Sequence, residues 1–218
     1  MTETVEITTP VGDVSGIIER PIVETGPAIL LAHGAGLGQE HPWMTSMKRA
    51  LIDVGHTVMT FDYLYMEQGR RAPDRMNKLL DVHEAAADVL REMEGSIVLA
   101  GKSMGGRVGS HLVSDGRCDA LGLVYLGYPL VAMGKSEPRD TSHLVAIDAP
   151  QLFITGTRDR MGPGDLIAEV AASVPNGTVE FIGTGDHSLV PLKRTGRTVD
   201  DSIAQSVDAI GTWTAIWA

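Results

Sequence analysis

The chain has 218 residues, of which 43% are hydrophobic, and its formal net charge is −10 at pH 7. A chain of this length is expected to fold as one domain over residues 1–218, with enough apolar surface to bury a sizeable core. The acidic balance disfavours nonspecific nucleic-acid binding, and no apolar run reaches the length that would cross a membrane.

The first predicted elements are two short strands, Val5–Thr8 and Val14–Glu19. A turn at residues 10–13 joins them, which indicates an antiparallel pair at the edge of a sheet. After them, apolar strands alternate with amphipathic helices. Strands are predicted at 28–32, 57–61, 97–100, 121–126, 151–156 and 179–182, and helices are predicted from about Trp43 to Val54, over 74–94, after Ser103, over 165–173 and from about Thr198.

This alternation predicts the α/β fold class. Near-continuous apolar strands separated by helices indicate a mainly parallel sheet, with helices on both faces. In such a sheet, the loops at the carboxyl ends of the strands meet at one edge and carry the reactive residues.

The most informative motif is the sequence Gly-Lys-Ser-Met-Gly at residues 101–105, which follows the apolar run at 97–100. A serine between two glycines at a strand-to-helix turn is typical of a nucleophile elbow. The glycines leave room for the sharp bend, and Ser103 is pushed outward. The same turn would direct the backbone amide of Met104 towards a negative oxygen formed beside Ser103.

A base and an orienting carboxylate follow Ser103 along the chain. Asp159 lies just beyond the predicted strand at 151–156, and His187 lies in a loop after the strand at 179–182. A serine needs such partners to act as a nucleophile at neutral pH. We therefore expect Ser103, Asp159 and His187 to form a catalytic triad, and we interpret the neighbouring Asp186 as a turn residue.

The oxyanion produced by attack of Ser103 on a carbonyl needs backbone donors. The glycine-rich loop after the strand at 28–32 supplies candidates. The amide of Met104 is predicted to act together with the amide of Ala35 or of Gly36. His33, which begins this loop, is interpreted as a residue that braces the loop by hydrogen bonding.

Four motifs together resemble a known family: Leu-Ala-His-Gly-Ala-Gly at 31–36, Gly-Lys-Ser-Met-Gly-Gly-Arg at 101–107, Gly-Tyr-Pro-Leu at 127–130 and Gly-Asp-His-Ser at 185–188. The chain resembles the α/β-hydrolase superfamily in its small, dienelactone-hydrolase-like branch. It is most similar there to the hydrolase-like domains of testis-expressed proteins and of a chromatin-complex subunit. The resemblance implies an α/β-hydrolase fold along nearly the whole chain. Dienelactone hydrolases carry cysteine at the elbow, so their substrate does not carry over to a chain with Ser103.

The substrate is expected to be a small, soluble carboxylic ester or thioester. The segment around 131–140 is too short for a large cap domain, which predicts an open and shallow site. The loop after Tyr63 carries Arg70, Arg71 and Arg75, which could receive a substrate carboxylate. The alternative for these arginines is a solvated basic loop.

Two nucleotide-binding patterns are near misses. Lys102 and Ser103 imitate the end of a phosphate-binding loop, but Ser96 stands where that pattern requires glycine. The glycines at 34–38 resemble a dinucleotide loop with incorrect spacing. The histidines lack the spacing of metal ligands, so no cofactor and no metal are expected.

Two other functions remain open. The chain could be a catalytically silent interaction protein with this fold, or a triad enzyme of haloperoxidase-like or lyase-like chemistry. The sequence leaves open whether the chain is a monomer or a homodimer. The lone Cys118 favours a reducing compartment, and an acidic N-terminus without the pattern of a signal peptide adds to this, so a cytoplasmic location is expected, with no membrane or nucleic-acid partner.

Overall fold

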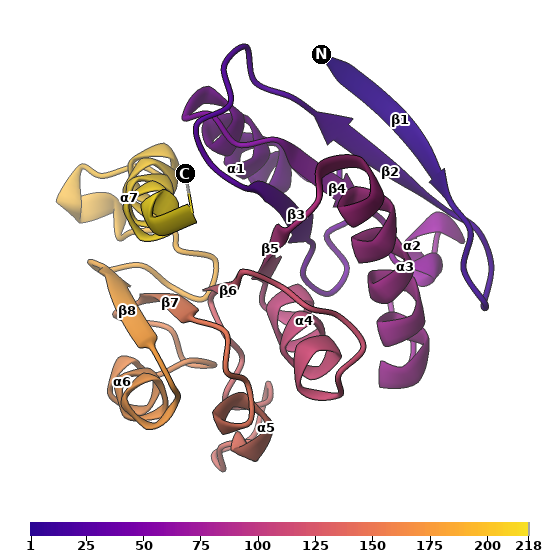
Figure 1. Ribbon diagram of the computed structural model, residues 1–218. Helices are drawn as coiled ribbons and strands as arrows, with labels where there is room; N and C mark the ends of the chain where they lie inside the picture. The colour runs from indigo at the N-terminus through magenta and orange to yellow at the C-terminus, as the bar shows by residue number, and fades with distance from the viewer. Residues whose placement is uncertain (218) are drawn as a thin grey trace.

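The computed structural model describes residues 1–217, which form an eight-stranded sheet with helices packed on both faces (Figure 1). The strands are β1 (Thr2–Ile7), β2 (Val14–Glu19), β3 (Ala28–Ala32), β4 (Val58–Phe61), β5 (Ile97–Lys102), β6 (Gly122–Leu126), β7 (Gln151–Gly156) and β8 (Gly177–Ile182). The helices are α1 (Pro42–Asp53), α2 (Leu64–Glu67), α3 (Met76–Glu94), α4 (Met104–Ser114), α5 (Ser142–Val145), α6 (Gly164–Ser173) and α7 (Val199–Thr214), with short 3₁₀ turns η1 (Lys193–Thr195) and η2 (Ala215–Trp217).

The strand order is β1-β2-β4-β3-β5-β6-β7-β8. The pairs β1–β2 and β2–β4 are antiparallel, and all the other neighbours are parallel. This arrangement confirms the predicted fold class, including the antiparallel strands at the N-terminal edge. It brings the carboxyl ends of β3, β5, β7 and β8 to one edge of the sheet.

The central strands are buried on both sides, which explains their near-continuous apolar sequences. Successive side chains on β5 point to opposite faces. Leu99 packs with α3 and α4, whereas Val98 and Ala100 pack with α1 and α7. A third apolar cluster, which includes Phe153 and Ile167, lies between the C-terminal half of the sheet and α6.

Several element boundaries differ from the sequence prediction. Helix α3 begins at Met76 instead of residue 74, because Arg75 adopts an extended backbone as its N-cap. Strand β1 begins at Thr2, earlier than predicted, because an exposed edge strand can carry polar residues on both faces. Val54 was expected to end the first long helix, but α1 ends at Asp53, and Val54 is 46% exposed.

The connection from β6 to β7 contains no large cap. Residues 127–150 hold only the four-residue helix α5 and an antiparallel bridge between Val131 and Pro138. Between residues 1 and 217, none of the helices combines the length and the apolar character needed to cross a bilayer.

Candidate active site

Ser103 lies at the turn between β5 and α4 with φ of 50° and ψ of −109°, a conformation that non-glycine residues rarely adopt. The flanking glycines allow this turn. A Cβ on Gly101 would lie 2.1 Å from the Gly106 nitrogen, and a Cβ on Gly105 would lie 2.5 Å from the Ala32 carbonyl oxygen. Both distances are shorter than any real contact. The strained turn directs the Ser103 side chain away from the sheet.

The three side chains expected to form a triad come together at the carboxyl edge of the sheet. His187 Nε2 lies 2.8 Å from Ser103 Oγ, and His187 Nδ1 lies 2.8 Å from Asp159 Oδ2. The Asp159 side chain is fully buried, whereas His187 remains partly accessible. Burial alone would raise the pKa of Asp159, but the hydrogen bond and charge of His187 and the amides of Met161 and Gly162 hold it below its usual value. Asp159 therefore stays ionised beside the imidazole.

The His187 loop is fixed by two charged residues. Lys102, only 2% exposed, donates a hydrogen bond of 2.5 Å from Nζ to the His187 carbonyl oxygen. Burial lowers the pKa of Lys102 to about 8, although Asp159 and Asp186 act in the opposite direction. Asp186 Oδ1 accepts from the amides of Ser188 and Val190 at 2.8 and 3.1 Å, which is the geometry of a turn residue. No pattern in the sequence indicated that Lys102 would be buried, apart from its place in the nucleophile motif.

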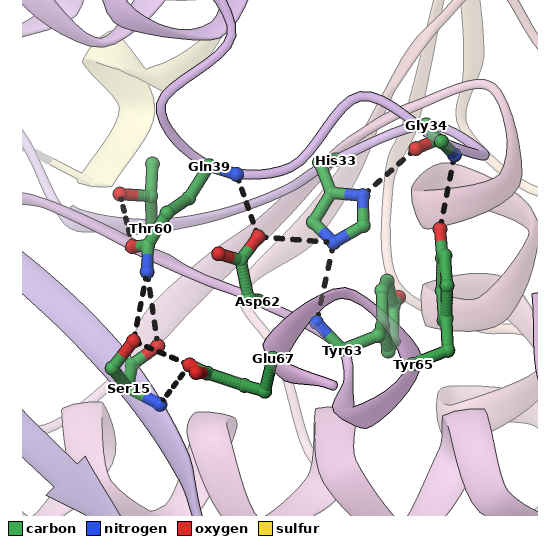
Figure 2. Close-up of polar contacts among 10 residues, drawn as sticks. Ser15, His33, Gly34, Gln39, Thr60, Asp62, Tyr63, Tyr65 and Glu67 are labelled. Atoms are coloured by element: carbon green, nitrogen blue, oxygen red, sulfur yellow. Dashed lines mark hydrogen bonds and ion pairs between the residues drawn. The ribbon is translucent and has the colours of Figure 1, made fainter. Parts of the chain in front are cut away.

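His33 is buried and braces the loop between β3 and α1 (Figure 2). Its Nδ1 lies 2.8 Å from the Gly34 carbonyl oxygen, and its Nε2 accepts the amide proton of Tyr63 at 3.2 Å. This pattern places the ring proton on Nδ1. Burial lowers the pKa of His33 to about 4, so the ring is neutral at pH 7 and Asp62, 3.5 Å from Nε2, forms no ion pair with it. The structure thus confirms the bracing role.

A polar network that sequence reasoning missed anchors the same loop to the sheet (Figure 2). Gln39 donates from its side chain to the backbone oxygen and the hydroxyl of Ser15 on β2, both at 3.2 Å, and accepts from Thr60 on β4 at 3.2 Å. The Gln39 amide donates to Asp62 at 2.7 Å. Glu67 on α2 accepts from the amide of Ser15 at 2.6 Å and from its hydroxyl. These contacts join residues far apart in sequence, so no local pattern could reveal them.

The candidate oxyanion donors differ in their availability. Within the described residues, the amides of Met104 and Ala35 have no hydrogen-bond partner, and both residues line the hollow beside Ser103. The amide of Gly36 instead donates to the Tyr65 hydroxyl at 3.1 Å. Of the two alternatives in this loop, Ala35 therefore has the free amide, and the expectation for Gly36 is corrected.

A hollow of about 290 Å³ opens beside Ser103. Its lining residues are Ala35, Pro73, Asp74, Met76, Leu79, Ser103, Met104, Arg107, Pro129, Arg139 and Met161. The three arginines singled out in the sequence do not line it: the 68–75 loop borders the hollow through Pro73 and Asp74. Arg70 is held by Asp74 at 2.9 Å and by Gln68, and Arg71 and Arg75 are exposed.

A larger hollow of about 610 Å³ lies at the opposite edge of the sheet, where Gly95, Ser96 and Leu121 precede β5 and β6. It contains none of the triad residues, so size alone does not mark the reactive site.

No cluster of three or more His, Cys, Asp or Glu side chains within residues 1–217 is arranged to hold a metal ion.

Comparisons with known proteins agree with this architecture. A serine hydrolase homologue from Coxiella burnetii aligns with a TM-score of 0.75 and 18% identity, covering 95% of this chain and 97% of its own. A serine hydrolase without a lid from Xanthomonas campestris aligns with a TM-score of 0.74 and 17% identity, and the alignment covers 98% of this chain and 95% of that one. A dienelactone hydrolase from Anabaena variabilis aligns with a TM-score of 0.73 and 18% identity, and the alignment covers 100% of this chain and 96% of that one. At these identities the likeness establishes the fold. The sequence of residues 25–215 also matches a family described as an alpha/beta hydrolase domain, and the chain therefore belongs to that family.

Proposed function

We propose that the protein is a serine hydrolase that cleaves small, soluble carboxylic esters or thioesters through an acyl-enzyme on Ser103. The observation that carries this proposal is the continuous pair of 2.8 Å contacts from Asp159 through His187 to Ser103 Oγ. A hydroxyl in contact with an imidazole whose other nitrogen meets a buried carboxylate is the arrangement that activates serine.

In the first half of the reaction, His187 Nε2 takes the proton of Ser103 as Oγ attacks the substrate carbonyl carbon. The negative oxygen accepts hydrogen bonds from the amides of Met104 and Ala35, each worth about 3 kcal/mol by the usual size of such contacts. Asp159 keeps the proton on Nδ1 and stabilises the imidazolium. The intermediate then expels the alcohol or thiol, which leaves with the proton from Nε2.

In the second half, water replaces the leaving group. His187 Nε2 removes a proton from this water as it attacks the acyl carbon, and the same nitrogen returns the proton to Ser103 when the carboxylic acid is released. No redox partner and no cofactor enters this sequence. Water is the only co-reactant besides the ester.

The expected substrates are small because the hollow beside Ser103 has only about 290 Å³. This volume is at the low end for ligand sites. The β6–β7 connection has no cap that would bury a long acyl chain. The lidless hydrolase from Xanthomonas campestris shares this feature by its description. We therefore favour short acyl groups over triglycerides.

Within the family, the motifs at 31–36, 101–107, 127–130 and 185–188 support a placement near the hydrolase-like domains of testis-expressed proteins and of a chromatin-complex subunit. We propose that the chain works as a single domain in the cytoplasm, on a small-molecule substrate. The lone Cys118, a buried thiol that has no cysteine to pair with, supports a reducing compartment.

Labelling of Ser103 tests the proposed function directly. A fluorophosphonate probe should modify wild-type protein at Ser103, and Ser103→Ala should abolish labelling and lower kcat for 4-nitrophenyl butyrate by about 10⁴-fold or more. Ser114→Ala, at the far end of α4, is the matched control and should retain both properties. An unlabelled wild type with no turnover of esters or thioesters would instead favour the silent interaction protein. Hydrolysis that persists in Ser103→Ala would contradict the mechanism.

A further inference from the structure

Two arginines in the hollow beside Ser103 lack an acidic partner. Arg107 and Arg139 both line this hollow, and neither guanidinium forms an ion pair or a hydrogen bond with another of residues 1–217. Some other arginines of the chain form ion pairs: Arg117, for example, contacts Asp81 at 2.7 Å and also contacts Glu84. The chain as a whole is acidic, with a net charge of −10, so carboxylates are abundant. Arg107 and Arg139 differ from the other unpaired arginines because their positive charge lies in the same hollow as Ser103.

The fold fixes the backbone of both arginines relative to Ser103. Arg107 lies one helical turn after Ser103, and its amide donates to the Ser103 carbonyl oxygen at 3.1 Å. Four residues of helix advance about 6 Å, so the guanidinium and the reactive hydroxyl are within reach of one small molecule. The backbone of Arg139 is held where its amide donates to Leu130 at 2.7 Å, next to the bridge between Val131 and Pro138.

The two positive charges influence each other. Burial and then the charge of Arg139 lower the pKa of Arg107, which means that the two guanidinium groups are close enough to repel. Arg107 is half-buried and Arg139 is exposed, and two like charges at one hollow repel each other. An anion between them would relieve this repulsion and could accept forked hydrogen bonds from both.

The other titratable groups near this pair leave its charge uncompensated. Asp74 lines the hollow, but its carboxylate is taken by Arg70, with contacts of 2.9 and 3.0 Å. His111, which lies on α4 with Arg107, stacks against His143 with ring centroids 3.9 Å apart. Burial lowers the pKa of His143 to about 4 and also lowers the pKa of His111, so both rings are neutral at pH 7.

We propose that Arg107 and Arg139 bind a carboxylate of the substrate while its scissile carbonyl lies against Ser103 Oγ. The proposal rests on the proposed hydrolase function and narrows its substrate class to short esters or thioesters that carry a carboxylate. The volume of about 290 Å³ corresponds to roughly ten water molecules, which suits a chain of a few carbons between carbonyl and carboxylate.

Paired substrates test the proposal. The first pair is mono-4-nitrophenyl glutarate and its methyl ester, which differ only in the charge at the end of the acyl chain. The second pair is acetoxyacetate and its methyl ester, in which the charge lies on the leaving group. The ratio of kcat/KM for charged over neutral ester is measured, so that a general loss of activity cancels.

Wild-type protein should prefer the charged ester in at least one pair. Arg107→Gln and Arg139→Gln should each lower that ratio by roughly ten- to hundredfold, the usual effect of losing a hydrogen bond to a charged group. Arg194→Gln, at an exposed arginine in η1, is the control and should keep the wild-type ratio. A ratio near one in both pairs, or one that neither substitution changes, overturns the carboxylate site while Ser103-dependent hydrolysis of the neutral esters stands.

A binding measurement separates the site from turnover. Glutarate titrated into Ser103→Ala should bind in calorimetry, and the double variant Arg107→Gln/Arg139→Gln on this background should lose that binding. If no ester is hydrolysed, the proposed function fails, but arginine-dependent glutarate binding still supports the anion site. Absence of glutarate binding, or tighter binding of inorganic phosphate than of glutarate, overturns the carboxylate assignment.

Discussion

Burial puts the ionisable side chains around Ser103 into different charge states. His33 is neutral because burial lowers its pKa to about 4, and its ring serves as a fixed donor and acceptor. Asp159 is equally enclosed but stays ionised, since His187 and two backbone amides bond to it. Lys102 is the exception, because a buried ammonium with one backbone acceptor is held at a cost to stability. Its benefit is the fixed position of the His187 loop.

Lys102 makes the stability of the fold depend on pH. Burial lowers its pKa from 10.5, the value of a solvated lysine, to about 8 in the folded protein. Between these values the unfolded chain binds more protons, so the free energy of unfolding rises with pH. The wild type should gain up to about 3 kcal/mol relative to Lys102→Met between pH 7.5 and 10.5, as measured by urea unfolding. Tyrosines titrate in both proteins, so the difference isolates Lys102.

The matched control for this experiment is Lys78→Met, which alters an exposed lysine on α3. The difference in free energy of unfolding between Lys78→Met and the wild type should not change with pH over the same range. If the difference between wild type and Lys102→Met is equally flat, or if it shrinks with rising pH, the ammonium of Lys102 is not held in a desolvated site.

The residues that carry the candidate chemistry were accessible from sequence to different degrees. Ser103 and His187 could be located because glycine-flanked turns after apolar strands are local patterns, which the sequence shows without knowledge of the fold. Arg107 was visible in the motif at 101–107. Whether it has an acidic partner depends on where carboxylates far away in the sequence lie in the fold, and the sequence alone does not show that. The ion pair between Arg70 and Asp74, by contrast, is local in sequence, and the prediction for Arg70 overlooked it.

At the scale of elements, strands and long helices were predictable because each carries a repeated apolar pattern. Helices α2 and α5 were not, since four residues are too few for a helical period to show. The short helix α2 nevertheless matters for the site. Glu67 and Tyr65 on α2 bond to Ser15 and to the Gly36 amide, so α2 supports the loop that presents Ala35 (Figure 2).

The support of this loop can be tested at Gln39, which is 3% exposed. Gln39→Leu removes three side-chain hydrogen bonds and leaves the hydroxyl of the buried Thr60 without that acceptor. We expect a loss of about 1–3 kcal/mol in the free energy of unfolding and a fall in kcat, because the Ala35 amide would no longer be held beside Ser103. Urea unfolding and ester kinetics measure the two effects.

A remote variant of similar stability separates positioning from general destabilisation. Thr198 caps α7 and exchanges hydrogen bonds with Asp201 in a capping box. Thr198→Ala should cost about 0.5–2 kcal/mol of stability and leave kcat unchanged. Equal losses of kcat in Gln39→Leu and Thr198→Ala would show that Gln39 acts only through stability.

At the scale of the whole molecule, one sheet separates two apolar layers. Helices α3 and α4 lie on one face of the sheet, and α1 and α7 lie on the other (Figure 1). The layer that includes α3 and α4 contains Cys118, whereas Trp43 is buried in the layer of α1 and α7, against which Trp213 and Trp217 pack. The sheet joins them because each central strand contributes side chains to both layers. We therefore propose that residues 1–217 unfold as one cooperative unit, which is the behaviour of a single domain.

Cys118 and the tryptophans report on opposite faces of the sheet and test this cooperativity. Burial raises the pKa of the Cys118 thiol to about 11, and the residue is 4% exposed, so an aromatic disulfide reagent at pH 8 should not react with the native protein. In urea, thiol labelling and tryptophan fluorescence should show the same midpoint, and labelling should reach one thiol per chain in concentrated guanidinium. A thiol that reacts at lower urea than the fluorescence change would mean that the layer of α3 and α4 opens first, because a single cooperative sheet cannot expose one face while the other stays packed.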